Sequence, residues 1–494
     1  MNIKAMIKHI FYLIALAVGL IFARTVGATE PMQMTMTLKP DGEVVLIMAG
    51  SGTVTIDWGE RSPSETHTLW VYDKEEWQNN WRKYAYIRAY SRKSARTITI
   101  TGENITHLEC NRLELTSLDV TKNAVLTNLN CSGNQLTSLD VSNNTALTDL
   151  RCGNNKLTSL DVSNNNAITY LDCWNNQITS LDVRKNIVLE ILYCSANLLT
   201  DLDVSNNAAL TELYCGNNKL TSLDISNNTA LTDLRCWNTH LTSLDVSNNT
   251  ALTYLDCWNN QITRLDVRKN TALKELYCGA NLLTDLDVSN NTALINLFCF
   301  DNQLTYFGVN SNTALTRLDC HNNRLSSFAL NALFLTLHSD TIPEEKRICI
   351  RNNPGIDACD QRIATHKGWM VICPVSPVQN VQSEVDTTMV TVDPGNTRPL
   401  FSGKDPEESF RNYIMHKTVY PQSAQNSGIQ GIVLVEFSIN RQGKVVDVQV
   451  LQSVHPLLDA EALRVVRSSP KWTPGMQRGK KVKVKYIFPF AFKL

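Results

Sequence analysis

The sequence predicts a multi-domain protein built around a solenoid of parallel β-strands, with a small β-sandwich before it and an α+β domain after it. Three observations carry this prediction. A cysteine recurs every 21 residues through the middle of the chain, alternating β-rich runs precede that repeat, and a basic segment with a helix–strand–strand–helix–strand pattern follows it. At 494 residues the chain is long enough for several such domains.

The N-terminus has the features of an export signal. Lys4 and Lys8 precede the apolar run IFYLIALAVGLIFA (residues 10–23), and Val26-Gly27-Ala28 offers a small-residue cleavage site. As a helix this run would be about 21 Å long, which is short of the roughly 30 Å hydrocarbon layer. We therefore expect residues 1–28 to be a signal peptide, with an uncleaved anchor as the alternative.

Residues 29–102 hold β-rich runs such as EVVLIMAG, TVTIDWGE and RTITITGENI, with turn residues between them. We expect a small β-sandwich here. The stretch GTVTIDWG resembles immunoglobulin-like modules of surface proteins. Because the open end of a solenoid needs a cap, this segment is predicted to be an immunoglobulin-like N-terminal cap domain.

Residues 103–373 carry the repeat, whose pattern is L-x-x-L-x-C-x-x-N-x-L-x-x-L-D-V-x-x-N-x-x. Alternation along a strand puts the second leucine and the cysteine on the same, inward side. Stacked coils bury such residues against one another, so we predict a column of core cysteines rather than metal ligands or disulfides. This cysteine column comprises Cys110, Cys131, Cys152, Cys173, Cys194, Cys215, Cys236, Cys257, Cys278, Cys299 and Cys320.

This pattern resembles the leucine-rich repeats of bacterial surface proteins such as the internalins. The resemblance implies a curved right-handed solenoid with a parallel sheet on its concave side.

Two asparagine columns are expected to satisfy backbone groups at the turns. An aspartate column beginning Asp119, Asp140 and Asp161 is expected to cap turns, with Ca²⁺ binding as the alternative. Cys349, Cys359 and Cys373 lie off the cysteine column and are the disulfide candidates, with their pairing open.

The strand positions that point outward combine aromatic and charged residues over about 35–40 Å, at 4.8 Å per coil. Such a surface fits contact with a protein or a glycan. The alternative is that the rings only stiffen the sheet by cross-strand pairing. The predicted partner-binding residues on the concave face are Arg151, Tyr170, Asp172, Trp174, Tyr193, Tyr214, Arg235, Trp237, Tyr254, Asp256, Trp258, Tyr277, Phe298 and Phe300.

Residues 374–408 are rich in Pro, Ser and Thr and are predicted to be a linker. From Phe410 onward the chain carries 13 Lys and Arg against 4 Asp and Glu, a difference of +9. Nucleic acid is an unsuitable partner for this basic segment, because the chain has an export signal and no nucleic-acid-binding motif.

Residues 409–494 closely resemble the C-terminal domain of TonB-type energy transducers. The residues that carry the resemblance are Tyr420-Pro421, Gly431, Gly443, Asp459, Ala462, Pro470, Trp472, Pro474, Gly475 and the run Val482–Phe490. The resemblance implies docking to outer-membrane TonB-dependent transporters, in which a transporter segment adds as a strand at a sheet edge. The implied partner edge is Lys481, Val482, Lys483, Val484, Lys485, Tyr486, Ile487 and Phe488.

These features predict a non-enzymatic TonB-like protein of the cell envelope, with the repeats as a protein-interaction scaffold. Its predicted location is the periplasm, with an inner-membrane anchor or the cell surface as the alternatives. The alternative is an exported adhesion or binding protein whose C-terminal domain serves only for attachment. Energy transduction is in question, because the proline-rich spacer of that family is replaced by a solenoid. No catalytic set, cofactor or metal site is predicted.

Overall fold

The structure is a computed structural model, and it describes residues 32–38, 42–59, 63–73, 76, 80–90, 96–340, 345–372, 399–401, 406–426, 429, 431–477 and 480–492. The predicted signal peptide, nearly all of the predicted linker and Cys373 lie outside these described residues. The chain forms two compact units, one of residues 1–286 with 290–299 and one of residues 287–289 with 300–494.

The first unit begins with an antiparallel sheet. Its elements are β1 (Met32–Leu38), β2 (Gly42–Asp57), β3 (Glu65–Thr68), a 3-10 turn (Trp81–Tyr84), β4 (Ala85–Tyr90), β5 (Arg96–Glu109) and β6 (Leu115–Asp119). Strand β2 pairs with β3, β4 and β5, while β1 pairs with β5 and β6. Alternate residues such as Met34, Met36, Ile98 and Ile100 are fully buried, so the predicted β-rich segment is present, and the described strands show part of the predicted sandwich.

Strand β5 belongs to two structures at once. Its first part pairs antiparallel with β1, and His107–Glu109 at its end pair parallel with the first coil strand of the solenoid. It therefore covers the edge of the first coil, as expected for a cap. The predicted domain boundary after Gly102 falls within this strand.

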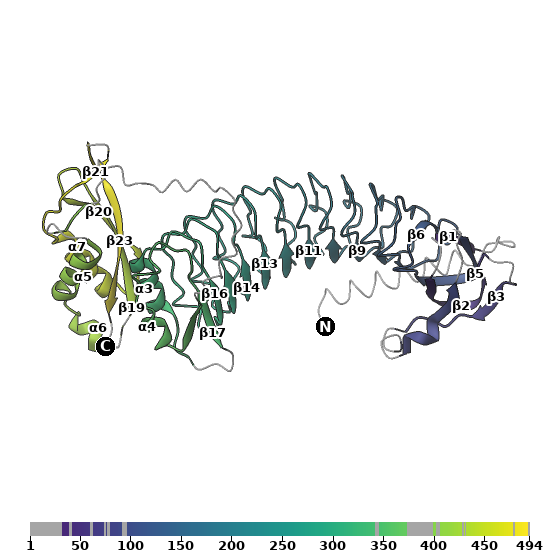
Figure 1. The fold of residues 1–494 in the computed structure, drawn as a ribbon, viewed down its shortest axis with the longest axis horizontal. Coiled ribbons are helices and arrows are strands. Elements are labelled where there is room, and N and C mark those ends of the chain that lie inside the picture. Colours follow the sequence, from purple (N-terminus) through teal and green to yellow (C-terminus); the bar gives the residue numbers. More distant parts are fainter. Residues whose placement is uncertain are drawn as a thin grey trace, which may run out of the picture. The chain divides into compact units, whose positions relative to one another are not determined.

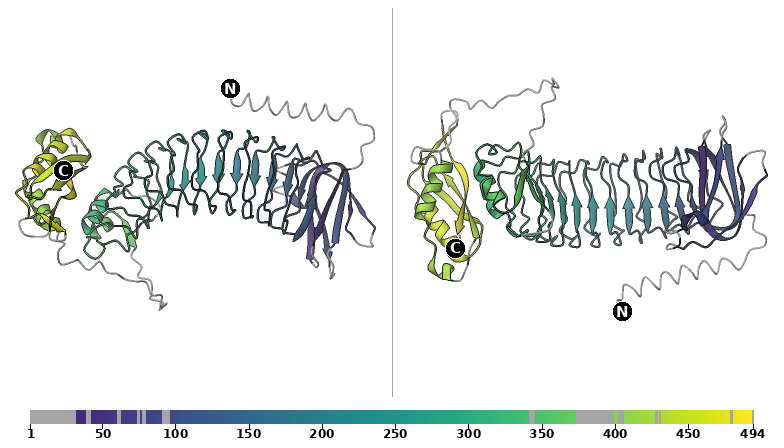
Figure 2. Two further views of the ribbon diagram at one scale, coloured as in Figure 1. Left: turned by 90° about the horizontal axis from the view of Figure 1, so that it is seen from above. Right: turned by 60° about the horizontal axis from the view of Figure 1, so that its bottom comes forward.

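The coils of the first unit each contribute one three-residue strand. These are β7 (Asn128–Asn130), β8 (Asp149–Arg151), β9 (Tyr170–Asp172), β10 (Ile191–Tyr193), β11 (Glu212–Tyr214), β12 (Asp233–Arg235), β13 (Tyr254–Asp256), β14 (Glu275–Tyr277) and β15 (Asn296–Phe298). They pair parallel and in register, and Figure 1 shows them side by side on the inner side of the curve of this unit. The views in Figure 2 show the same succession of strands.

The predicted inward residues are confirmed. The central leucine of each strand and all eleven cysteines of the column are buried with essentially no exposed surface. Burial raises the pKa of the Cys131 and Cys215 thiols to about 12, so these groups stay protonated and inert at neutral pH. The cysteines contribute volume to the core.

The asparagine three residues after the cysteine ties neighbouring coils together. Asn218 donates from Nδ2 to the carbonyls of Cys194 and Cys215 at 3.0 and 2.9 Å, and its Oδ1 accepts from the N–H of Leu199 at 3.0 Å. The second column donates similarly, with Asn207 bound to the carbonyls of Val183 and Asn186. Buried backbone groups at the turns are thereby satisfied.

The second unit contains the last coils of the repeat. It contains β16 (Arg317–Asp319), α3 (Ser327–Thr336), β17 (Lys346–Cys349), α4 (Arg362–Thr365) and β18 (Trp369–Ile372). Strands β16, β17 and β18 pair parallel in that order. After α3, a strand, a short helix and a final strand follow in the part of the chain where the 21-residue period has ended.

The C-terminal part of the second unit has helices α5 (Pro406–Lys417), α6 (Gln422–Asn426) and α7 (Pro456–Arg467), and strands β19 (Gly431–Ile439), β20 (Val445–Gln452), β21 (Gly475–Gln477), β22 (Lys480–Val482) and β23 (Val484–Phe492). The larger sheet has the order β20–β19–β23. The buried face of α7, which includes Leu458 and Val465, joins Phe437 and Phe488 of that sheet in one core with Trp472. Pro456 at the first position of α7 and the His455 side chain, which accepts from Leu457 N–H, fix where the helix begins.

Candidate functional site

The strand face is the surface formed by the residues one and three positions before each cysteine of the column, together with the residue one position after it. In β8 to β15 the central leucine is buried while its two neighbours are partly or fully exposed. All of the predicted concave-face residues occupy these outward positions. The alternation predicted from the sequence therefore places those of the first unit on one surface, and it places Phe300 at the equivalent outward position in the second unit.

A continuous row of rings crosses the strand face of the first unit. Tyr193 stacks on Tyr214 with ring centres 4.2 Å apart, and Tyr277 stacks on Phe298 at 4.8 Å. The guanidinium of Arg235 lies 4.4 Å from the ring centre of Tyr214. The row is completed by Arg151 over Tyr170, by Tyr170 against Tyr193, by Arg235 over Tyr254 and by Tyr254 against Tyr277.

Carboxylates three residues before the cysteines anchor this row. The phenol of Tyr214 donates to Asp233 Oδ2 at 2.9 Å, and the same carboxylate pairs with Arg235 at 2.9 Å. Tyr277 donates to Glu275 at 2.7 Å. Burial, together with these bonds to carboxylates, raises the pKa of both phenols, so they remain neutral donors. These acidic partners were not among the predicted site residues, because only some coils carry an acid three positions before the cysteine.

Two matching clusters stand 84 residues apart on the strand face. Asp172 accepts from the backbone N–H of Trp174 at 3.1 Å, and Asp256 accepts from that of Trp258 at 3.1 Å. Burial raises the pKa of each aspartate to about 6, against the lowering effect of these hydrogen bonds. The two tryptophan side chains are 44% and 36% exposed, which makes them the most accessible large apolar groups of the strand face.

Glycine in the preceding coil makes room for two of the tryptophans. A Cβ at Gly153 would lie 2.4 Å from the ring of Trp174, and one at Gly216 would lie 2.8 Å from the ring of Trp237. Each indole ring therefore packs directly against the glycine of the preceding coil, where a larger residue would clash with it. Trp237 is half-buried and contributes less accessible surface than Trp174.

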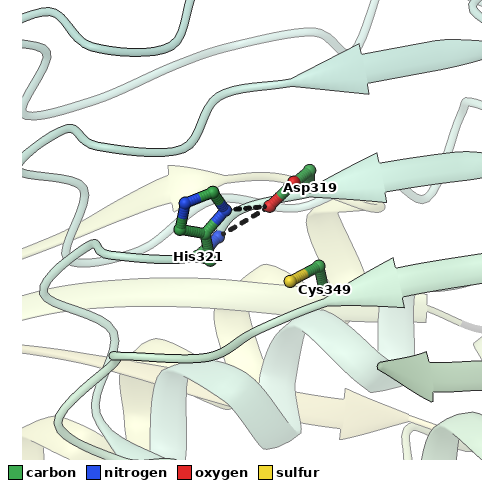
Figure 3. A group of neighbouring side chains, drawn as sticks. All are labelled: Asp319, His321 and Cys349. Atoms are coloured by element: carbon green, nitrogen blue, oxygen red, sulfur yellow. Dashed lines mark hydrogen bonds and ion pairs between the residues drawn. The ribbon is translucent and has the colours of Figure 1, made fainter. Parts of the chain in front are cut away.

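A mixed group of side chains lies on the strand face of the second unit, and the sequence interpretation did not predict it. The ligand-type atoms of Asp319, His321 and Cys349 all lie within 4.8 Å of one another. Figure 3 shows the His321 imidazole beside the Asp319 carboxylate and the Cys349 thiol below them, on the next strand. Burial and the nearby Asp319 carboxylate raise the pKa of Cys349 to about 11. The distance of 29 residues from Cys320 to Cys349 hid this grouping, since the repeat period is 21.

The aspartate column caps turns, as expected. Oδ1 of Asp140 accepts from the N–H of Ser142 at 2.9 Å, and Asp161 does the same with Ser163. These bonds lower the pKa of both carboxylates. Each carboxylate thus serves its own coil, and the structure gives no convergence of these groups that would favour the Ca²⁺ alternative among the described residues.

The edge strand of the C-terminal sheet is shorter at its start than predicted. Lys481 and Val482 belong to β22, which pairs with β21 in a separate two-stranded hairpin. The edge strand itself is β23, and within the described part of the chain it pairs only with β19. The change of partner at Lys483 separates the two, so of the predicted edge residues only Val484 to Phe488 lie on β23.

Two lysines near this edge are paired across the sheet. Lys485 forms an ion pair with Glu436 of β19 at 3.0 Å, and Lys483 forms one with Asp447 of β20. Each lysine charge is therefore balanced by a carboxylate of the same sheet. Across the described ranges, none of the helices combines the length and the apolar character needed to cross a membrane.

Comparison with known proteins gives two separate matches. Residues 416–494 match the family described as Gram-negative bacterial TonB protein C-terminal, and residues 250–291 match leucine-rich repeats in two copies. Protein TonB of Pseudomonas aeruginosa is 33% identical over 95 residues, which is 19% of this chain and 28% of that protein. Protein TonB of Helicobacter pylori is 35% identical over 82 residues, which is 16% of this chain and 27% of that protein. The chain thus spans under a third of the length of these curated relatives.

Solved structures similar to this chain include two proteins of Listeria monocytogenes. The functional domain of InlJ, described as including a cysteine ladder, is 30% identical, with a TM-score of 0.34 over 50% of this chain and 76% of that one. The internalin InlF is 25% identical, with a TM-score of 0.46 over 50% of this chain and 74% of that one. The repeat pattern, the parallel coils and the C-terminal family match together identify the chain as a leucine-rich-repeat solenoid joined to a TonB-type C-terminal domain.

Proposed function

We propose that this protein docks to an outer-membrane TonB-dependent transporter through its C-terminal domain and holds a second envelope component on its strand face. The observation that carries the proposal is the position of β23 at the edge of a sheet within a region that matches the TonB C-terminal family. An exposed edge offers a row of backbone donors and acceptors to an extended segment of a partner.

The pairing register indicates which residues of β23 offer their backbone to such a segment. Pro489 is opposite Leu434 of β19, and proline within a strand is tolerated where its missing N–H would face away from the neighbouring strand. Alternate residues of an antiparallel strand share this orientation. The N–H groups of Lys485 and Ile487 therefore point to the outer side of β23, where a transporter segment would pair.

This assignment suggests a test with a matched control. Lys485→Pro removes one outward N–H and leaves the N–H groups that face β19, whereas Lys485→Ala removes the same charge and keeps the N–H. Peptides from the periplasmic N-terminal segments of TonB-dependent transporters serve as probes in a pull-down with the full chain. We expect Lys485→Pro to weaken capture by about tenfold or more and Lys485→Ala to weaken it by less than about threefold, because one lost backbone bond in a short augmented strand costs about 1–2 kcal/mol.

Equal capture by the two variants would overturn strand addition at β23. Circular dichroism of both variants shows whether the domain keeps its fold, so that a loss of capture is assigned to the edge. An equal loss in both would instead attribute docking to the Lys485 charge.

The strand face supports the second part of the proposal. Trp174 and Trp258 are exposed while the tyrosine row behind them is fixed by stacking and by carboxylates. Rigid aromatic groups with a polar rim are typical of protein contact surfaces, because their burial costs little conformational entropy. The alternative function, adhesion with the C-terminal domain serving for attachment alone, uses this same face and predicts no capture of transporter peptides.

A further inference from the structure

In the last coils, three side chains that can bind a metal lie at outward positions of the strands and not in the core. They are Asp319, His321 and Cys349. Strands β16 and β17 pair parallel with Asp319 opposite Cys349. In this coil Ile350 is fully buried, at the position that the column cysteines occupy elsewhere. Cys349 is therefore displaced by one residue onto the strand face, where its thiol contributes nothing to the column. Its presence there calls for a separate explanation.

The other two members of the set converge on the same point. Asp319 Oδ1 lies 2.6 Å from Nδ1 of His321, and it also accepts from the backbone N–H of His321 at 3.1 Å. The His321 ring stacks on Phe300 with centres 4.8 Å apart and planes within 5°, which fixes the orientation of the imidazole. The side chains of His321 and Asp319 keep 13% and 23% of their surface exposed, so an ion can reach them from solvent.

We propose that Asp319, His321 and Cys349 bind a zinc ion on the partly exposed side of β16 and β17 in the second unit. One thiolate sulfur, one imidazole nitrogen and one carboxylate oxygen make a ligand set that Zn²⁺ accepts, whereas Mg²⁺ and Ca²⁺ require oxygen ligands. The three donor atoms lie within 4.8 Å of one another, close enough to contact one ion after small side-chain movements. The ion replaces the direct contact between the carboxylate and Nδ1.

A three-ligand site leaves one tetrahedral position open. Here the open position lies on the partly exposed side of β16 and β17. Water fills it in the isolated protein, and a donor atom of a bound partner can replace that water. The zinc site is independent of the docking proposal for β23, because it uses none of the same residues.

The test uses Co²⁺ as a spectroscopic substitute for Zn²⁺ in the full chain, kept reduced with a phosphine. We expect one equivalent of Co²⁺ to give tetrahedral visible bands and a near-ultraviolet sulfur-to-cobalt charge-transfer band, both removed by added Zn²⁺. Cys349→Ser should abolish the charge-transfer band. Asp319→Asn, which keeps an acceptor for the His321 N–H, and His321→Phe, which keeps a ring to stack on Phe300, should each weaken Zn²⁺ binding by about tenfold or more.

Asp140→Asn is the matched control, because Asp140 also accepts from a backbone N–H two residues later, at 2.9 Å, and lies outside both the strand face and the proposed zinc site. It should bind Co²⁺ as the wild type does. In addition, Zn²⁺ should protect Cys349 of the wild-type protein from alkylation, as mapped by mass spectrometry. The proposal fails if the wild type shows no charge-transfer band, if the band persists in Cys349→Ser, or if Zn²⁺ leaves alkylation of Cys349 unchanged.

Discussion

Asp256 accepts a hydrogen bond from the backbone N–H of Trp258 at 3.1 Å while lying mostly buried in the strand face, and this combination makes it sensitive to pH. Burial raises the pKa of Asp256 to about 6 from the 3.8 of an ordinary aspartate. The folded state therefore binds the proton more tightly than the unfolded state. The stabilisation by this proton is fully present below about pH 4 and is lost as the pH rises through about 6.

Because this stabilisation is lost as the pH rises, the stability of the wild type should depend on pH in this range. Between about pH 5 and about pH 7 the free energy of unfolding of the wild type should fall by about 1 kcal/mol relative to that of Asp256→Asn, which keeps an acceptor for Trp258 but does not titrate. Urea titrations at the two pH values measure the difference. Asp140→Asn is the control: hydrogen bonds lower the pKa of Asp140, so this variant should run parallel to the wild type over that range. Parallel behaviour of Asp256→Asn would contradict the prediction.

The asparagine column should account for a large share of coil stability. Asn218→Ala removes two donors and one acceptor that satisfy the backbone of Cys194, Cys215 and Leu199. Leaving three buried backbone groups without partners should cost about 3 kcal/mol or more. Denaturant unfolding followed by circular dichroism measures this loss.

A neighbouring asparagine supplies the comparison. Asn227 is exposed and donates to the carbonyl of Ser205 at 3.2 Å, so Asn227→Ala should cost less than about 1 kcal/mol, as is usual for exposed positions. Similar losses at positions 218 and 227 would show that the buried network is not what ties the coils together.

Cys236 should be unreactive in the folded protein. It is fully buried, and burial raises the pKa of its thiol well above its ordinary value, so neither access nor thiolate is available to a reagent. Alkylation in native buffer followed by mass mapping should leave Cys236 unmodified, and the same treatment in denaturant should modify it. Rapid native modification of Cys236 would mean that the coils open on the time scale of the reaction.

The exposed tryptophans should be the main contacts of the strand face. Replacing both Trp174 and Trp258 with Ala removes the largest accessible apolar groups there and should weaken partner binding by about tenfold or more. Binding of the purified protein to glycan arrays and to fractionated envelope proteins provides the readout. Ile187→Ala is the control, because Ile187 is 62% exposed but is not part of the strand face. Unchanged binding of the double variant to every ligand of the wild type would leave the aromatic row with a structural role alone.

Much of the fold could be predicted because the same 21-residue pattern of buried and exposed positions recurs in each coil. Side chains alternate between inward and outward directions along a strand. The burial of Cys236 and the exposure of Trp258 could therefore be predicted from their positions in the repeat. The C-terminal domain was predictable for a different reason, since its scattered glycine, proline and tryptophan positions match a known family over residues 416–494.

The sequence by itself therefore determined the solenoid, its core column and the surface on which partners are expected, because these depend on periodicity within each coil. The tertiary structure decided the contacts between coils, such as Tyr214 with Asp233, because these depend on how neighbouring coils stack. It also decided the division between β22 and β23, and it brought Cys349 beside Asp319. Helix α3 lies between β16 and β17, so the 21-residue spacing does not show which residues of these two strands are neighbours. The strand pairing shows that Asp319 lies opposite Cys349.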